Sequence, residues 1–264
     1  MSDPASIKIQ SKPEELYARS LLYRALSILF RHPSLTKNLN LNKEFSSWKD
    51  AVETLSFPLK EPLVLYCEAL VMELSRITHD EWTKQHESCF GHTVSGVMTN
   101  YELEYGEEHS HRQPQQLGDI AAFYLAFGIQ LSEKIHERVD HIAVECEFLH
   151  YLIFKEAFAL ECDKQQEAQI CREATRRFLL EHLGCWLPSF CLRLSKKSSG
   201  LLHASTFCAK DFSGSFFPSI QATNCGYPWN LLRIASANPA RGFPMPPSSS
   251  ESFVLLPNHE PIFH

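Results

Sequence analysis

The sequence predicts an all-α protein, built as a single helical-bundle domain followed by a poorly ordered tail. Apolar residues recur at intervals of three and four through roughly the first two hundred residues of the chain. No segment alternates apolar and polar residues as a half-buried strand would, and no internal repeat is present. The 10 glycines among 264 residues are few, which also favours helices over a glycine-rich nucleotide-binding fold.

The first helix is predicted over residues 14–31, where apolar positions share one face and His32-Pro33 ends the pattern. The polar stretch of residues 34–50 is predicted to be a connection. A second helix follows over residues 63–74. A third begins after Thr78, because Thr78 and Glu81 have the spacing of a capping box.

Glycines and a proline predict a loop over residues 91–114, followed by a helix over residues 117–128. The next helix is predicted over residues 138–161. A last long segment, residues 164–194, keeps the helical spacing but contains Gly184 and Pro188, so a kink or break is expected there. One more helix fits residues 201–217.

Charged residues become rare after about residue 213 and the stretch "PMPPSSSES" has low complexity. The predicted boundary therefore separates a helical domain, residues 1–212, from a tail, residues 213–264.

Composition excludes several classes of protein. The net charge of −6 lacks the basic excess of a nucleic-acid binder, although an acidic surface suits a basic peptide. The nine cysteines form no Cys-x-x-Cys pair and their number is odd, which argues against a disulfide framework and a zinc knuckle. Cys67, Cys146 and Cys171 fall on apolar stripes and are expected to be buried, as in a reducing compartment. No secretory signal and no membrane span is predicted, so the cytoplasm is the expected location.

Two Glu-x-x-His pairs, Glu147–His150 and Glu133–His136, have the spacing that di-iron helical bundles use. A metal-dependent helical oxidoreductase is therefore one alternative. Such a site also needs two further glutamates on other helices, and the two pairs lie close together in the chain. No phosphate loop, dinucleotide fingerprint or nucleophile motif is present, so no catalytic residue is predicted.

Asp140 and His141 are adjacent polar residues in an apolar segment. Side chains of neighbouring helical residues point about 100° apart, so the two would not face each other on a helix. His141 would instead lie one turn from Glu145, and the simplest interpretation is an ion pair on a solvated helix face.

The segment "ERVDHIAVECEFLHYL", residues 137–152, resembles the signature of the TorD/DmsD/NarJ family of redox-enzyme maturation chaperones, approximately E-x-P-D-H-hydrophobic-x-x-E-L-x-F. The matching residues are Glu137, Asp140, His141, Ile142, Glu145 and Phe148. Val139 and Cys146 depart from it, where proline and leucine are usual.

Three more segments resemble the family in order and spacing: "YELEY" at residues 101–105, residues 117–133 and residues 178–190. The resemblance covers roughly residues 14–212, and the "NYELEYG" segment is most similar to chaperones that serve dimethyl-sulfoxide-reductase-type molybdoenzymes.

The resemblance implies a TorD-like all-helical domain with no enzymatic activity. Members bind the twin-arginine signal peptide and the apo-form of a molybdopterin oxidoreductase catalytic subunit, assist cofactor insertion and delay export. No nucleic acid and no cofactor is implied, apart from GTP, which has been suggested for some members. Either a monomer or a domain-swapped dimer is implied, with a hinge between Glu133 and Val139. A helical regulator of another kind is the third alternative.

The predicted site is a groove that receives the apolar part of the leader as a helix. Its expected lining residues are Phe90, Tyr101, Tyr105, Phe127 and Trp186. The acids Glu102, Glu104 and Asp140 are expected to hold the arginine pair through bidentate hydrogen bonds. His141 is expected to orient Asp140, and Glu145 completes the set of client-binding residues that the resemblance implies.

Overall fold

The computed structural model describes residues 12–37, 39, 41–56, 60–91, 98–105, 113–132, 135, 137–205 and 209. Within these residues the regular structure is helical, and Tyr101 and His141 form an isolated antiparallel β-bridge. The predicted all-α class is therefore confirmed. The predicted tail, residues 213–264, and the domain boundary before it lie outside the described residues.

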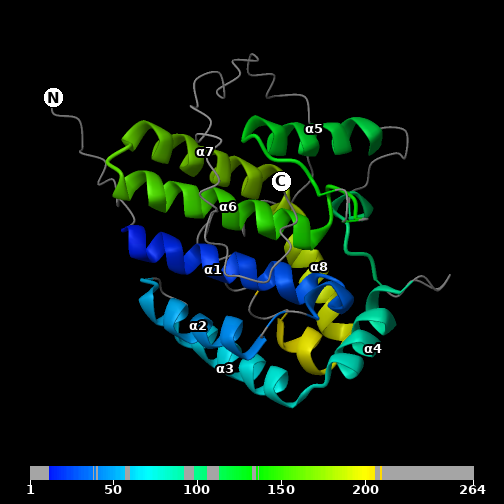
Figure 1. The fold of residues 1–264 in the computed structure, drawn as a ribbon. Coiled ribbons are helices and arrows are strands. Elements are labelled where there is room, and N and C mark those ends of the chain that lie inside the picture. The colour runs from blue at the N-terminus through cyan, green and yellow to red at the C-terminus, as the bar shows by residue number, and fades with distance from the viewer. Residues whose placement is uncertain are drawn as a thin grey trace, which may run out of the picture.

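Eight α-helices and two short 3-10 helices are named in the described part of the chain (Figure 1). In chain order they are α1 (Pro13–Phe30), η1 (Pro33–Thr36), α2 (Leu41–Thr54), α3 (Lys60–Arg76), α4 (His79–Phe90), η2 (Glu102–Glu104), α5 (Gln113–Ala126), α6 (Ile142–Glu161), α7 (Gln165–Glu181) and α8 (Leu183–Lys197). Residues 200–205 are also helical.

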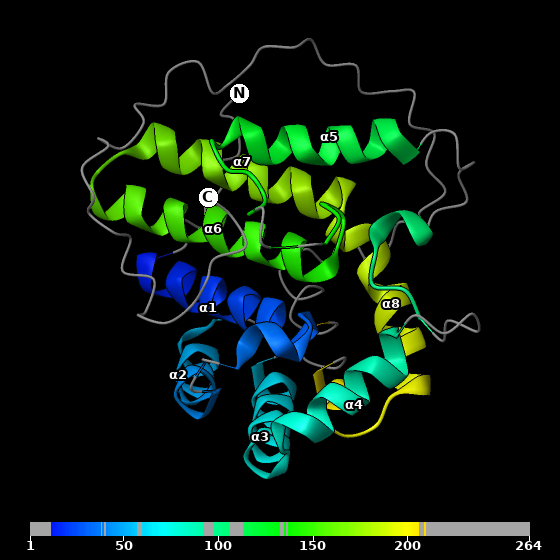
Figure 2. The same ribbon diagram turned by 45° about the vertical axis from the view of Figure 1, so that its right-hand side comes forward.

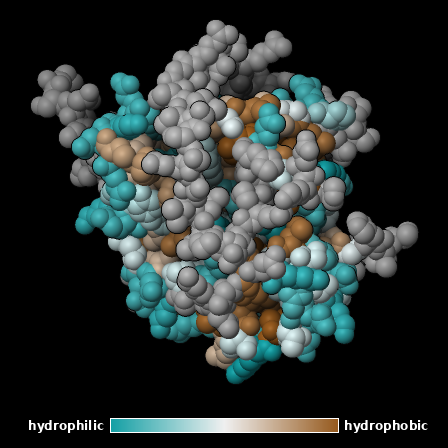
Figure 3. Space-filling view, in the orientation of Figure 1, coloured by the Kyte–Doolittle hydropathy of each residue, from teal (hydrophilic) through white to brown (hydrophobic). Residues whose placement is uncertain are grey.

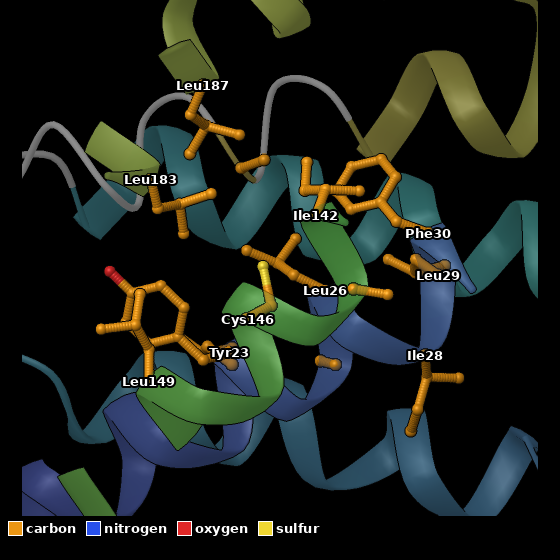
Figure 4. Packing of buried hydrophobic residues seen from close by; sticks show 14 of the residues in the cluster. Tyr23, Leu26, Ile28, Leu29, Phe30, Ile142, Cys146, Leu149, Leu183 and Leu187 are labelled. Atoms are coloured by element: carbon orange, nitrogen blue, oxygen red, sulfur yellow. The ribbon is translucent and has the colours of Figure 1, made fainter. Parts of the chain in front are cut away.

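Helix α6 lies at the centre of the bundle. It packs between α1 and α7, while α2 packs on α1 and α3 packs on α2, so these helices form successive layers (Figures 1 and 2). Helix α8 crosses near the end of α6 where Ile142 lies. Leu26 and Phe30 of α1 pack there with Ile142 and Cys146 of α6 and with Leu187 of α8 (Figure 4). The start of α6 is therefore fixed from several sides at once.

The structure corrects one missed helix and the start of another. Residues 41–54 form α2 rather than a connection, because Trp48, Ala51, Val52 and Leu55 have helical spacing and are buried. The polar residues between them hid that short apolar stripe. Helix α6 begins at Ile142 and not at residue 138, since His141 is extended and caps the helix.

Other predicted features are confirmed. Thr78 and Glu81 form the capping box at the start of α4. The break in the last long segment falls at His182, two residues before Gly184, whereas Pro188 lies inside α8 without ending it. Cys67, Cys146 and Cys171 are buried.

Much of the described surface is polar. On the face shown in Figure 3, apolar residues reach the surface in separate patches among polar ones. None of the described helices combines the length and hydropathy needed to cross a bilayer.

Candidate functional site

Residues 98–105 are joined to the start of α6 by backbone hydrogen bonds. The N–H of Ile142 donates to the carbonyl of Asn100, and the N–H of Glu102 donates to the carbonyl of Asp140, both at 2.9 Å. The resulting bridge brings the rings of Tyr101 and His141 to 5.2 Å between centroids. The two segments that resemblance singled out, "YELEY" and the Asp-His pair, therefore form one structural unit.

Asp140 is completely buried and acts as an anchor inside this unit. Its Oδ2 accepts the N–H of Leu103 at 3.2 Å, which fixes the short helix η2. Arg138 donates to both carboxylate oxygens, from Nε to Oδ1 at 2.9 Å and from Nη2 to Oδ2 at 2.6 Å. This bond to Asp140 raises the pKa of Arg138 above its already high ordinary value.

The network reaches the surface at Arg138. Its Nη1 donates to Glu104 at 3.2 Å, and its guanidinium carbon lies 4.6 Å from the centroid of the Tyr101 ring. The hydroxyl of Tyr101 donates to Glu137 at 2.6 Å. Burial, followed by this bond to Glu137, raises the pKa of Tyr101, so the hydroxyl keeps its proton.

His141 caps α6 and is 1% exposed. Its Nδ1 accepts the N–H of Ala143 at 3.1 Å, while the side-chain amide of Asn100 lies 2.8 Å from Nε2. Burial, with smaller contributions from His86 and Arg31, lowers the pKa of His141 to about 3, so the ring is neutral near pH 7.

Glu145 lies on the first turn of α6, beneath η2. The indole N–H of Trp186 donates to its Oε2 at 3.1 Å, and Nδ1 of His182 lies 3.2 Å from Oε1 of Glu102. The remaining oxygens, Glu102 Oε2 and Glu145 Oε1, have no N–H or O–H donor among the described residues. Burial, then the charge of Glu102 and a hydrogen bond with it, raises the pKa of Glu145 well above its ordinary value. A proton on Glu145 would supply the missing donor between the two carboxyl groups.

The interpretation of His141 and Glu145 as an ion pair on a solvated helix face is therefore wrong. Both residues are buried, and His141 precedes the helix instead of lying one turn along its surface. Asp140, which was expected to help hold the arginine pair of a leader, is buried in this structure and its carboxylate bonds to Arg138.

The predicted lining residues are only partly brought together. The rings of Tyr105 and Trp186 lie 5.1 Å apart and those of Trp186 and Phe190 lie 5.5 Å apart. Phe90 stacks on Phe190 at 6.2 Å. Trp186 belongs to the buried core, whereas Phe90 and Tyr105 are half-buried at its edge. Phe127 packs elsewhere, 6.0 Å from the ring of Phe148.

The Glu-x-x-His pair on α6 makes contacts between helices. Oε2 of Glu147 lies 3.7 Å from Nη2 of Arg31, the residue that follows α1, and Nδ1 of His150 lies 2.8 Å from the hydroxyl of Ser20 on α1. Glu133 and His136 lie outside the described residues. Among the described side chains, no three His, Cys, Asp or Glu residues gather as metal ligands would.

Sequence reasoning missed three residues of the site: Asn100, Arg138 and His182. His182 lies in a segment that the family resemblance covers, so a signal for it existed. Asn100 directly precedes "YELEY". Arg138 stands at a variable position of the motif, where only the contacts to Asp140 and Glu104 identify it.

Comparisons with known proteins match this part of the chain. The model of the family described as "Nitrate reductase delta subunit" matches residues 53–192, just over half of the 264 residues. The chain is 40% identical over 83 residues to the "Selenate reductase assembly chaperone protein" of Thauera selenatis, covering 31% of this chain and 42% of the relative. It is 37% identical over 78 residues to the "Chlorate reductase assembly chaperone protein" of Ideonella dechloratans, covering 30% and 39%.

A third relative is "Chaperone protein TorD" of Vibrio cholerae serotype O1, which is 26% identical over 99 residues, covering 37% of this chain and 42% of the relative. The chain thus spans about two fifths of the length of the curated relatives that it matches.

Proposed function

Because the chain belongs to the nitrate reductase delta subunit family, the family that includes the TorD and NarJ proteins, we propose that it is an assembly chaperone for one molybdopterin-dependent oxidoreductase. It binds the cofactor-free catalytic subunit and the twin-arginine leader of that subunit, assists cofactor insertion and delays export. It acts by binding and is not an enzyme. Its place of action is the cytoplasm, where the leader is present before export.

The similarity to two reductase assembly chaperones is the observation that carries this proposal. The geometry around η2 supports it. Glu104 is a part-exposed carboxylate bonded to the guanidinium of Arg138, and Glu137 is a part-exposed carboxylate that accepts from Tyr101. Tyr105 and Phe90 are half-buried aromatic residues that both pack against Phe190. A leader has a basic head and an apolar helical stretch, so carboxylates beside aromatic rings are complementary to both parts.

The roles of the motif residues differ in this proposal. Glu104 and Glu137 contact the basic head of the leader. Asp140 and His141 hold η2 and the bridge in place, and Glu145 supports η2 from below. Trp186 acts through its bond to Glu145, while Phe127 contributes to packing.

Co-purification from the native host tests the partner. The expected result is an oxidoreductase catalytic subunit that is recovered with the tagged full-length chain and is depleted of its molybdopterin cofactor. Recovery of no such subunit contradicts the chaperone function. Size-exclusion chromatography of the same sample determines whether the chaperone is a monomer or a dimer.

Calorimetry with the partner's leader peptide tests the surface. The double variant Glu104→Gln, Glu137→Gln is expected to weaken Kd about three- to tenfold, because it removes two charges at the rim of the site. Glu173→Gln is the matched control, since this exposed acid pairs with Arg176 on α7. An unchanged Kd in the double variant excludes these acids from the binding surface. Titration with GTP in the same series tests nucleotide binding, for which the chain has no phosphate loop.

A further inference from the structure

Arg138 occupies a site with three features that select a guanidinium group. Asp140 accepts a two-pronged hydrogen bond, at 2.9 and 2.6 Å. Glu104 accepts a third bond at 3.2 Å, and the Tyr101 ring lies 4.6 Å from the guanidinium carbon. A forked bond to a carboxylate together with an aromatic face distinguishes arginine from lysine. Tyr101, Glu104 and Asp140 are called the guanidinium cradle below.

The guanidinium cradle opens toward solvent on the side where Arg138 lies. The side chain of Asp140 is 0% exposed, whereas those of Arg138 and Glu104 are 37% and 43% exposed. A buried carboxylate requires a cation, because leaving one unpaired is costly. Here the cation is the side chain of Arg138, which belongs to no helix. A second guanidinium that enters from solvent can donate the same hydrogen bonds to Asp140.

Charge around the guanidinium cradle favours a further cation. In the contacts that the structure describes, the carboxylates of Glu104 and Asp140 both bond to the one guanidinium of Arg138, and a third carboxylate, that of Glu137, accepts from the hydroxyl of Tyr101. The neighbouring His141 is neutral near pH 7. The guanidinium of Arg193 lies against another ring, with its central carbon 4.8 Å from the centroid of Tyr105.

We propose that the guanidinium cradle is a receptor site for an arginine side chain of a bound peptide, in which Arg138 is the exchangeable internal occupant. An incoming arginine takes the fork on Asp140, and Arg138 moves toward solvent. The identity of the peptide rests on the proposed function, whereas the exchange is a property of this chain alone. Arg138 must leave before the peptide arginine can bind. The apparent affinity for the peptide is therefore the intrinsic affinity multiplied by the fraction of molecules in which the cradle is empty. Binding therefore stays reversible, as release of a client requires.

The first experiment uses the full chain without any client. Arg138→Ala empties the guanidinium cradle, and thermal unfolding is measured with ethylguanidinium or ethylammonium at equal concentration and ionic strength. Ethylguanidinium is expected to raise the Tm of this variant more than ethylammonium does, since a ligand that binds the folded state stabilises it. Arg177→Ala is the matched control, because Arg177 lies 5.4 Å from the Phe123 ring and pairs with Glu181 without a buried acid.

If the two cations raise the Tm of Arg138→Ala equally, the proposed guanidinium site is wrong. It is also wrong if ethylguanidinium raises the Tm of Arg138→Ala and Arg177→Ala equally. Co-purification of the oxidoreductase subunit would still support the chaperone function in that case. If Arg138→Ala does not fold, Arg138→Gln, which keeps a polar side chain, is measured in the same way.

The second experiment identifies the source of the guanidinium. The leader peptide is expected to bind Arg138→Gln about three- to tenfold more tightly than the unsubstituted chain, because the competitor is gone. The same peptide with citrulline in place of arginine is expected to lose this gain. Free arginine that binds as tightly as the peptide would show an amino-acid site instead and would overturn the peptide assignment, as would a citrulline peptide that keeps the gain.

Discussion

Tyr101 and His141 face each other across an antiparallel β-bridge, with their rings edge to face and 5.2 Å between centroids. The bridge attaches η2 to the first turn of α6. A substitution at His141 therefore changes two elements at once, the cap of a core helix and the position of the segment that carries Glu102 and Glu104. Asp140 and His141 therefore set the position of the part-exposed Glu104 through that segment.

Substitution His141→Ala is expected to lower the free energy of unfolding by about 2–4 kcal/mol, because it removes a helix cap and leaves a buried cavity. His141→Asn is expected to cost less, since asparagine is a good cap. Urea unfolding followed by circular dichroism measures both. If His141→Ala keeps full stability and loses leader binding, the imidazole contacts the client directly and the positioning role is wrong.

The sequence was informative where structure depends on local spacing. It predicted the helices around Leu22, Tyr124 and Phe178 and the cap at Thr78 because each depends on residues within one or two turns. The stripe of α2 is short and diluted by polar residues, so its helix was missed. The pairing of Tyr101 with His141 depends on a long-range contact, and the position of Arg138 depends on which carboxylate it reaches. No local pattern encodes either.

Acid is expected to destabilise the fold through its buried imidazoles. Burial is the main cause that lowers the pKa of His86 to about 4 and that of His141 to about 3, below the ordinary value of 6.5. The unfolded state then binds more protons between these values, so stability is complete above pH 6.5 and falls as pH decreases. Each such histidine costs about 1.4 kcal/mol for every pH unit within its window.

Thermal unfolding between pH 7 and pH 4 measures this slope. His86→Gln is expected to reduce it, although the variant also loses the contact of His86 Nε2 with the carbonyl of Phe30, 3.4 Å away. A slope that is the same with and without His86 would show that this imidazole is protonated in the folded state.

Two glycines are expected to respond in opposite directions to alanine. Gly118 lies in α5, and apart from its chain neighbours and the backbone of its own helix no heavy atom lies within 4 Å of an added Cβ, so Gly118→Ala is expected to stabilise by about 0.5–1 kcal/mol. Gly200 has a φ of +60°, and a Cβ there would lie 2.9 Å from Nε2 of Gln85. Gly200→Ala is expected to destabilise by about 1 kcal/mol or more. Shifts of Tm in the same direction would contradict the backbone assignment at one of the two positions.

Glu145 is expected to carry a proton at neutral pH, and this makes the fold less stable in base. Its folded-state pKa is raised, chiefly by burial, so the folded state binds more protons than the unfolded state above the ordinary value of 4.5. The stabilisation is complete below pH 4.5 and is lost as pH rises toward the folded-state pKa. Glu145→Gln is expected to remove this loss, because the amide can still accept from Trp186 and donate to Glu102.

Thermal unfolding at pH 8 should then give a higher Tm for Glu145→Gln than for the unsubstituted chain, with the difference shrinking toward pH 5. Difference infrared spectroscopy provides an independent check, since a protonated carboxyl group has a carbonyl stretch that a carboxylate lacks. That band should be present at neutral pH and absent in Glu145→Gln. Glu145→Ala should be less stable at every pH, because it leaves the indole N–H of Trp186 buried without its acceptor. A Gln variant that behaves like the Ala variant would mean that Glu145 is ionised in the folded state.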